Sequence, residues 1–186
     1  PIRGSYLVKN ADFVACHNQS YITKYDIVNE VKEGGVFLLN TGWSDEDLNT
    51  KLPAKVRREI AKKNIQFYCI DAVDMARKIG LGNRTNTILQ SAFFKITNII
   101  PYEEAVSFMK KAIDKSYGKK GEKIVNMNYA AVDRGAEYEK LEVPAEWSNV
   151  ASRFRPASFD RLAPEWVRNV ADVVNAQNGY DIPVSA

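Results

Sequence analysis

The sequence predicts an α/β protein of three layers, in which a mostly parallel sheet is flanked by helices. Three short apolar segments each turn abruptly polar, and a helical pattern follows each of them. Such alternation favours a parallel sheet, whose crossover connections are nearly always right-handed. The predicted strands are residues 12–17, 35–40 and 65–71.

Polar side chains stand at the point where each predicted strand ends. The carboxyl ends of parallel strands form the edge at which ligands collect in open α/β sheets. A small-molecule site is therefore predicted at this edge, although no self-contained catalytic set accompanies it. The residues expected to face it are His17, Asn18, Asn40, Thr41 and Asp71.

Helix-start and helix-stop residues predict short helices between the strands. The first is expected to carry Tyr21, Tyr25 and Val28 on one stripe. The predicted helices run from Asn18 to Gly34-Gly35, from Ser44 with acidic residues in its first turn, from Pro53 to Lys63, and from Asp71 to Gly80.

The second half of the chain predicts helices without strands. Between Asn83 and about Gly135, three helical patterns end before Pro101, at Gly118 and at Gly135. We expect these helices to cover the faces of the sheet. The pattern then dissolves until Pro164, which predicts an ordered but irregular linker, and residues 165–175 can form one last helix.

Composition suits one domain with an extension. The chain has 186 residues, 45% of them hydrophobic, and a formal charge of +3, which is too slight to argue for nucleic acid as a partner. No apolar stretch approaches the roughly 18 residues that a membrane span needs, and no signal peptide is visible. The chain begins with Pro1, which predicts a piece of a longer polypeptide.

The two cysteines lie within apolar strands and lack CxxC spacing. We therefore expect Cys16 and Cys69 to be small buried hydrophobic side chains in a reducing, cytosolic compartment. His17 is the only histidine, and a structural role is favoured over general base catalysis because no nucleophile stands beside it. One histidine, two separated cysteines and scattered carboxylates predict no metal site.

Two further segments leave alternatives open. Residues 80–86 form a glycine-containing loop before a helix, and a plain connection is as well supported as a ligand loop. Asn128 lies on a mostly apolar helix, where a buried amide needs a partner. A bond within the protein is modestly favoured over a ligand there.

Seven segments in order resemble the pyruvate:ferredoxin (flavodoxin) oxidoreductase family, in the domain equivalent to the gamma chain of the multi-subunit 2-oxoacid oxidoreductases. The resemblance is nearly continuous from Pro1 to about Ala136. The tail resembles the connection toward the iron–sulfur domain. The segments are residues 11–18, 34–40, 60–68, 79–82, 92–95, 117–123 and 126–133.

The resemblance implies an enzyme of anaerobic metabolism and electron transport. The family enzyme decarboxylates pyruvate on thiamine diphosphate with Mg, passes electrons through three [4Fe-4S] clusters to ferredoxin or flavodoxin, and delivers the acetyl group to coenzyme A. The thiamine and cluster machinery is implied to lie elsewhere, so this segment carries no catalytic residue and no metal. Its implied role is to hold coenzyme A.

Two coenzyme-site asparagines of the family fall on Asn86 and Asn128 of this sequence. The family's glycine-rich phosphate loop and a nearby lysine would precede Pro1, so the resemblance implies a sheet that lacks its N-terminal strand here. It also implies a cytoplasmic homodimer in which this segment contacts the remaining domains. The isolated segment is not expected to be active.

The resemblance implies three parts: a partial gamma-type domain at residues 1–137, an irregular linker at 138–163, and a helix with a connection toward an iron–sulfur domain at 164–186. One alternative is a non-catalytic packing or interaction domain of the same assembly. Another is an autonomous nucleotide-binding module, which the absence of a glycine-rich phosphate loop disfavours.

Overall fold

The computed structural model describes residues 8–151, 163–175 and 182. Its centre is a four-stranded sheet in the order β1, β2, β3, β4, in which the first three strands are parallel and β4 runs antiparallel to β3. The mostly parallel sheet of the predicted α/β class is thus confirmed. The strands are β1 (Ala11–Cys16), β2 (Val31–Asn40), β3 (Gln66–Ile70) and β4 (Glu139–Leu141).

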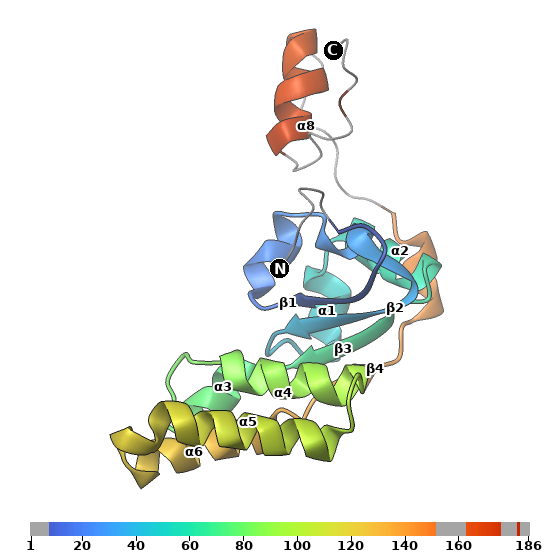
Figure 1. The fold of residues 1–186 in the computed structure, drawn as a ribbon. Helices are drawn as coiled ribbons and strands as arrows, with labels where there is room; N and C mark the ends of the chain where they lie inside the picture. Colours follow the sequence, from blue (N-terminus) through green and yellow to red (C-terminus); the bar gives the residue numbers. More distant parts are fainter. Residues whose placement is uncertain (1–7, 152–162, 176–181, 183–186) are drawn as a thin grey trace.

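Helices cover both faces of this sheet, which confirms the predicted layers. In Figure 1 the first two α-helices lie on one side of the sheet and the next four on the other. The helices are α1 (Asp45–Lys51), α2 (Ala54–Lys62), α3 (Ala72–Lys78), α4 (Asn86–Thr97), α5 (Tyr102–Tyr117) and α6 (Glu122–Arg134).

The alternation of side chains along β2 explains the two-sided core. Phe37 and Leu39 point into one apolar cluster with the side chains of α1 and α2, whereas Leu38 points into a second cluster with α3, α4 and α6. All three are at most 1% exposed. Because a strand buried on both faces must be apolar at every position, this segment reads as a continuous apolar run in the sequence.

Helices α4, α5 and α6 alternate in direction along the chain (Figure 1). The Lys110–Asp133 ion pair at 2.8 Å and the bond from Tyr129 to Asp114 at 2.6 Å fix α5 antiparallel to α6. Helix α4 runs antiparallel to α5 and hence parallel to α6 (Figure 1), and the hydroxyl of Ser91 on α4 donates to the carbonyl of Val132 on α6 at 2.6 Å.

The segment between β1 and β2 differs from the prediction of one helix ending at Gly34-Gly35. It forms two short 3₁₀ helices, η1 (Gln19–Thr23) and η2 (Ile27–Glu30), and both glycines lie inside β2. Gly34 has φ +69°, a conformation that costs glycine little, at the point where the β1–β2 register shifts. The glycines therefore accommodate an irregular strand and do not stop a helix.

The segment after α6 is more regular than the predicted linker. It contains β4 and the 3₁₀ helix η4 (Ala145–Asn149), whose Trp147 is 3% exposed. The indole of Trp147 donates to Oδ1 of Asn49 at 2.6 Å, and Arg58 donates to the carbonyl of Val150 at 2.6 Å. These contacts fasten the segment to α1 and α2. The domain boundaries inferred from the sequence remain predictions.

The remaining short elements agree with the sequence pattern. The turn between α5 and α6 is η3 (Gly118–Lys120). Residues 165–175 are helical, as predicted, and include the π-helical η5 (Val167–Ala171) and α8 (Asp172–Asn175). Within the described residues, no helix combines the length and apolarity that crossing a membrane requires.

Candidate functional site

A polar cavity of about 560 Å³ lies at the carboxyl edge of the three parallel strands. We call it the carboxyl-edge crevice. All five residues predicted to face this edge line it, together with residues of α3 and of the loop before α4. The lining is His17, Asn18, Gln19, Asn40, Thr41, Gly42, Asp71, Val73, Asp74, Arg77, Asn83 and Thr85.

Asn40 is a structural member of this crevice. Its side chain is 6% exposed, its Nδ2 donates to the carbonyl of His17 at 2.9 Å, and its Oδ1 accepts from the amide of Ala72 at 3.0 Å. A single side chain thus joins the end of β1, the end of β2 and the start of α3. Since the nitrogen and the oxygen of its side-chain amide are both hydrogen-bonded to the backbone, Asn40 holds the shape of the crevice and is not a candidate for binding a ligand.

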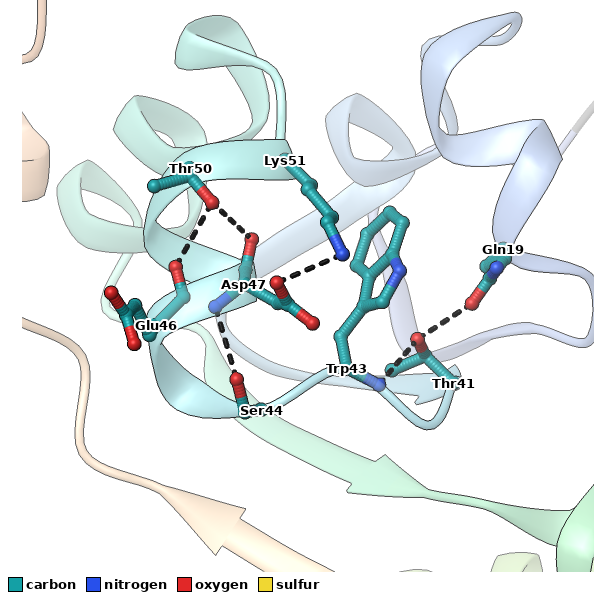
Figure 2. A network of polar contacts seen from close by, with 8 residues as sticks. All are labelled: Gln19, Thr41, Trp43, Ser44, Glu46, Asp47, Thr50 and Lys51. Carbon is teal, nitrogen blue, oxygen red and sulfur yellow. Dashed lines mark hydrogen bonds and ion pairs between the residues drawn. The ribbon is translucent and has the colours of Figure 1, made fainter.

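The hydroxyl of Thr41 is also hydrogen-bonded within the protein, as Figure 2 shows. Its hydroxyl donates to Oε1 of Gln19 at 2.7 Å and accepts from the amide of Trp43 at 3.2 Å. This geometry directs the chain from β2 into α1, where Ser44 caps the helix by accepting from the amide of Asp47 at 3.2 Å. The predicted start of α1 at Ser44 is confirmed.

One carboxylate oxygen of Asp71 accepts a hydrogen bond within the described residues, and the other does not. Its Oδ1 accepts from the amide of Asp74 at 2.9 Å and caps α3, as predicted. Its Oδ2 lies only 2.5 Å from the position that a Cβ atom on Gly42 would occupy. Residue 42 must therefore lack a side chain for the carboxylate to keep this place at the crevice.

Three exposed side chains that line the crevice are available to bind a ligand: His17, Arg77 and Asn83. Within the described part of the chain, none of them has a side-chain hydrogen bond or an ion pair. They come from the end of β1, from α3 and from the loop before α4, so a ligand in the crevice would meet three different elements. Imidazole, guanidinium and amide groups together offer both donors and acceptors.

Arg77 did not figure in the sequence-based prediction. Helical spacing could have indicated it, because Asp74 and Arg77 lie three residues apart on α3. Their side chains are therefore on the same side of the helix, and both line the crevice. The neighbouring Asp74 is already paired with Lys78 at 2.6 Å. Arg77 is thus the one cation that lines the crevice among the described residues.

Neither of the two asparagines predicted to contact coenzyme A belongs to the lining of this crevice. Asn86 is the exposed first residue of α4, directly after the lining residue Thr85. Asn128 is 6% exposed on α6, and its Nδ2 donates to the carbonyl of Ile124 in the same helix at 2.8 Å. No described residue donates to its Oδ1.

Asn86 and Asn128 lie at comparable positions along the neighbouring parallel helices α4 and α6. The contact between Ser91 and Val132 joins the parallel helices α4 and α6. Asn86 lies five residues before Ser91, and Asn128 lies four residues before Val132. Each asparagine therefore lies roughly one turn before the contact between these neighbouring helices.

The cysteines are buried, as predicted. Cys16 is 2% and Cys69 is 8% exposed. Burial raises the pKa of the Cys16 thiol, and burial together with the Glu139 and Asp45 carboxylates raises the pKa of Cys69 to about 12. Among the described residues, no three His, Cys, Asp or Glu side chains come together as metal ligands. The thiols on β1 and β3 do not fit an iron–sulfur cluster, which needs four ligands.

A larger cavity of about 860 Å³ lies away from the strand ends. It is lined by residues of α1, α2 and their connection, and by Val150 and Ala151. Its described lining contains none of the residues that the sequence marks as candidates for ligand binding. The carboxyl-edge crevice is therefore the better candidate site, since it lies where parallel sheets bind their ligands.

The sheet, its flanking helices and this crevice define the class of α/β domains that bind ligands at the carboxyl ends of parallel strands. A family model described as "Pyruvate ferredoxin/flavodoxin oxidoreductase" matches residues 1–138. The chain belongs to this family, as its gamma-type domain.

Full-length relatives agree with this membership. The chain is 47% identical to the pyruvate:ferredoxin oxidoreductase of Moorella thermoacetica over 186 residues and 41% identical to the pyruvate-flavodoxin oxidoreductase of Klebsiella pneumoniae over 187 residues. Each alignment covers 100% of this chain and 16% of the relative. The chain thus spans about a sixth of the length of these relatives.

A solved structure supports the fold. The crystal structure of pyruvate oxidoreductase subunit PORC from Thermotoga maritima matches this chain with a TM-score of 0.57 and 24% sequence identity. The match covers 73% of this chain and 67% of that subunit. At this identity the likeness concerns the fold alone.

Proposed function

We propose that this chain binds coenzyme A within an enzyme that oxidatively decarboxylates pyruvate to acetyl-CoA and CO₂ and passes the electrons to ferredoxin or flavodoxin. The observation that carries the proposal is the polar carboxyl-edge crevice, whose lining residue Thr85 directly precedes Asn86, the first residue of α4. Family membership supplies the reaction, since the relatives are pyruvate:ferredoxin and pyruvate-flavodoxin oxidoreductases.

The asparagines supply hydrogen bonds in this proposal. Asn86 is exposed and offers a side-chain amide beside the crevice. Asn128 keeps Oδ1 for a donor from the coenzyme while its Nδ2 is held by Ile124, which fixes the direction of the amide. Amide groups of this kind suit the two amides of the pantetheine arm, each of which has one donor and one acceptor.

The remaining chemistry belongs to other parts of the proposed enzyme. Thiamine diphosphate with Mg and three [4Fe-4S] clusters would decarboxylate pyruvate and carry electrons on domains outside this chain. The proposed enzyme is a cytoplasmic homodimer, and this chain packs against its remaining domains. The part played by these residues is to bind and orient the acetyl acceptor.

Steady-state kinetics of the complete enzyme test the proposal. Asn86→Ala and Asn128→Ala should each raise the KM for coenzyme A several-fold, because one lost hydrogen bond costs on the order of 0.5–1.5 kcal/mol. The KM for pyruvate and the decarboxylation that precedes the coenzyme step should be unchanged. Asn126→Ala, which removes an exposed amide on the same helix, is the matched control.

A packing domain without a coenzyme site is the second candidate. Two observations favour it: Asn128 is buried with its Nδ2 bonded inside its own helix, and Asn40 is fully occupied by the protein. If both asparagine variants bind coenzyme A normally and Asn128→Ala lowers thermal stability, this candidate replaces the coenzyme proposal.

A further inference from the structure

The helical segment of residues 165–175 carries an apolar stripe that the other described residues do not cover. Trp166, Val170 and Val174 are spaced four residues apart, about one helical turn, so they lie along one side of the helix. Trp166 is 65% and Val174 is 51% exposed. We call this side of the helix the tryptophan stripe.

The helix stands apart from the sheet and from the helices that flank it, as Figure 1 shows. In the described part of the chain, its apolar side chains belong to none of the three buried apolar clusters. The hydrogen bond from Nδ2 of Asn169 to Oε1 of Glu165, at 3.4 Å, lies within the helix itself. These contacts do not anchor the helix on the domain.

A helix of this length needs a packing partner. Isolated helices shorter than about 12–15 residues are only marginally stable in water, and proteins stabilise them by burying an apolar side. This helix has 11 residues. We therefore expect the tryptophan stripe to pack against a surface outside the described residues.

The charges beside the stripe indicate what kind of surface it meets. Helices that lie on a membrane are rich in lysine and arginine on their polar side. Here Arg168 is the only base, and Glu165 and Asp172 are acidic. A protein groove with an apolar floor and basic side chains at its rim fits these groups better than a membrane surface.

The relatives indicate where such a groove would lie. The alignments with the Moorella thermoacetica and Klebsiella pneumoniae enzymes cover 100% of this chain and 16% of each relative. In both relatives the counterpart of the helix is thus joined covalently to a much longer polypeptide. A surface elsewhere in that polypeptide is held close to the helix, which lowers the cost of bringing the two together.

We infer that the tryptophan stripe docks into an apolar groove with a basic rim on another domain of the same polypeptide, with the Trp166 indole as its anchor. The inference rests on the proposed function in one respect, namely that this chain packs against the remaining domains of a larger enzyme. It does not depend on coenzyme binding.

Hydrogen exchange of the complete enzyme, measured by mass spectrometry, tests this contact. Peptides from residues 165–175 should exchange slowly in the parent enzyme. Trp166→Ala should speed their exchange on the order of tenfold, because the apolar contact is lost while alanine itself favours the helix. Arg168→Ala, the matched control on the polar side, should change the exchange by about twofold or less.

A photo-crosslink identifies the surface. With p-benzoylphenylalanine in place of Val174, the complete enzyme should form a crosslink to a peptide outside residues 1–186, in a product that keeps the mass of one polypeptide. A crosslink within residues 1–186, a crosslink between two polypeptides, or no crosslink overturns the inference. Fast exchange of the helix in the parent enzyme, or equal effects of Trp166→Ala and Arg168→Ala, does so as well.

These outcomes are separate from those of the coenzyme test. If the helix is protected and forms the expected crosslink while the asparagine variants leave the KM for coenzyme A unchanged, the docking inference stands and the coenzyme proposal is wrong. If Asn86→Ala raises that KM while the helix exchanges fast in the parent enzyme, the coenzyme proposal stands and the docking inference is wrong.

Discussion

The side-chain amide of Asn40 holds the main-chain carbonyl of His17 at 2.9 Å and thereby joins the ends of β1 and β2. The same amide accepts from the first residue of α3 at 3.0 Å. The shape of the carboxyl-edge crevice thus depends on one buried side chain whose partners are both backbone groups. Removing it leaves a carbonyl and an amide without their partner.

Asn40→Ala should lower the free energy of unfolding by about 2 kcal/mol, because two buried hydrogen bonds are lost and backbone groups are left unsatisfied. Thermal or urea denaturation measures the change. Asn83→Ala, which truncates an exposed amide of the same crevice, should stay within about 0.5 kcal/mol of the parent protein. Equal stability of the two variants would contradict a structural role for Asn40.

The sequence was informative where a topological rule applies. Polar residues after parallel strands must share one edge, so the positions of His17, Asn40 and Asp71 could be predicted from the strand ends alone. What each side chain does there could not be predicted. The partners of Asn40 are backbone atoms 23 and 32 residues away, and no local pattern marks them.

Two segments differ from the prediction, one for a local reason and one because of a long-range pairing. Tyr21, Tyr25 and Val28 have helical spacing, but Tyr21 lies in η1, Val28 lies in η2, and Tyr25 lies between these two short 3₁₀ helices. Strand β4 is three residues long and partly charged, so it lacks any apolar alternation. Its pairing is set by β3, a strand about 70 residues earlier in the chain.

The close contact of α4 and α6 predicts a strong effect at Gly135. A Cβ atom there would lie 2.3 Å from Cβ of Ser91 and 2.6 Å from the carbonyl of Ile88. Gly135→Ala should therefore lower the free energy of unfolding by about 1–3 kcal/mol, the usual cost of overpacking. Urea denaturation measures it.

Gly118 provides the control for this substitution. It has φ −51°, and a Cβ atom there meets nothing within 4 Å. Gly118→Ala should be neutral or stabilising by up to about 1 kcal/mol, since alanine restricts the unfolded chain. A Gly135→Ala protein as stable as the Gly118→Ala protein would show that α4 and α6 do not meet as described.

Trp147 anchors the segment after β4. It is 3% exposed, its ring packs against Phe67 with centroids 6.3 Å apart, and its indole donates to Asn49. Trp147→Ala should cost about 3–5 kcal/mol of stability, as large cavities do. Trp166→Ala, at a tryptophan that is 65% exposed, should have little effect on the denaturation midpoint. Similar midpoints for the two variants would argue against the anchor.

The buried thiol of Cys69 should make the free energy of unfolding fall at alkaline pH. Its pKa rises from 9.0 to about 12 on folding, chiefly because burial disfavours the thiolate. The folded state therefore keeps the proton that the unfolded state loses. The stabilisation is fully present below pH 9 and is lost as the pH rises from about 9 to about 12.

The free energy of unfolding should consequently fall more steeply over this range in the parent protein than in Cys69→Ala. Comparing the two slopes cancels the titration of the lysines and tyrosines that both proteins share. At pH 8 the native thiol should also react slowly with a disulfide reagent, and rapidly once urea unfolds the chain. Identical slopes, together with rapid labelling of the folded protein, would place Cys69 outside the buried face of β3.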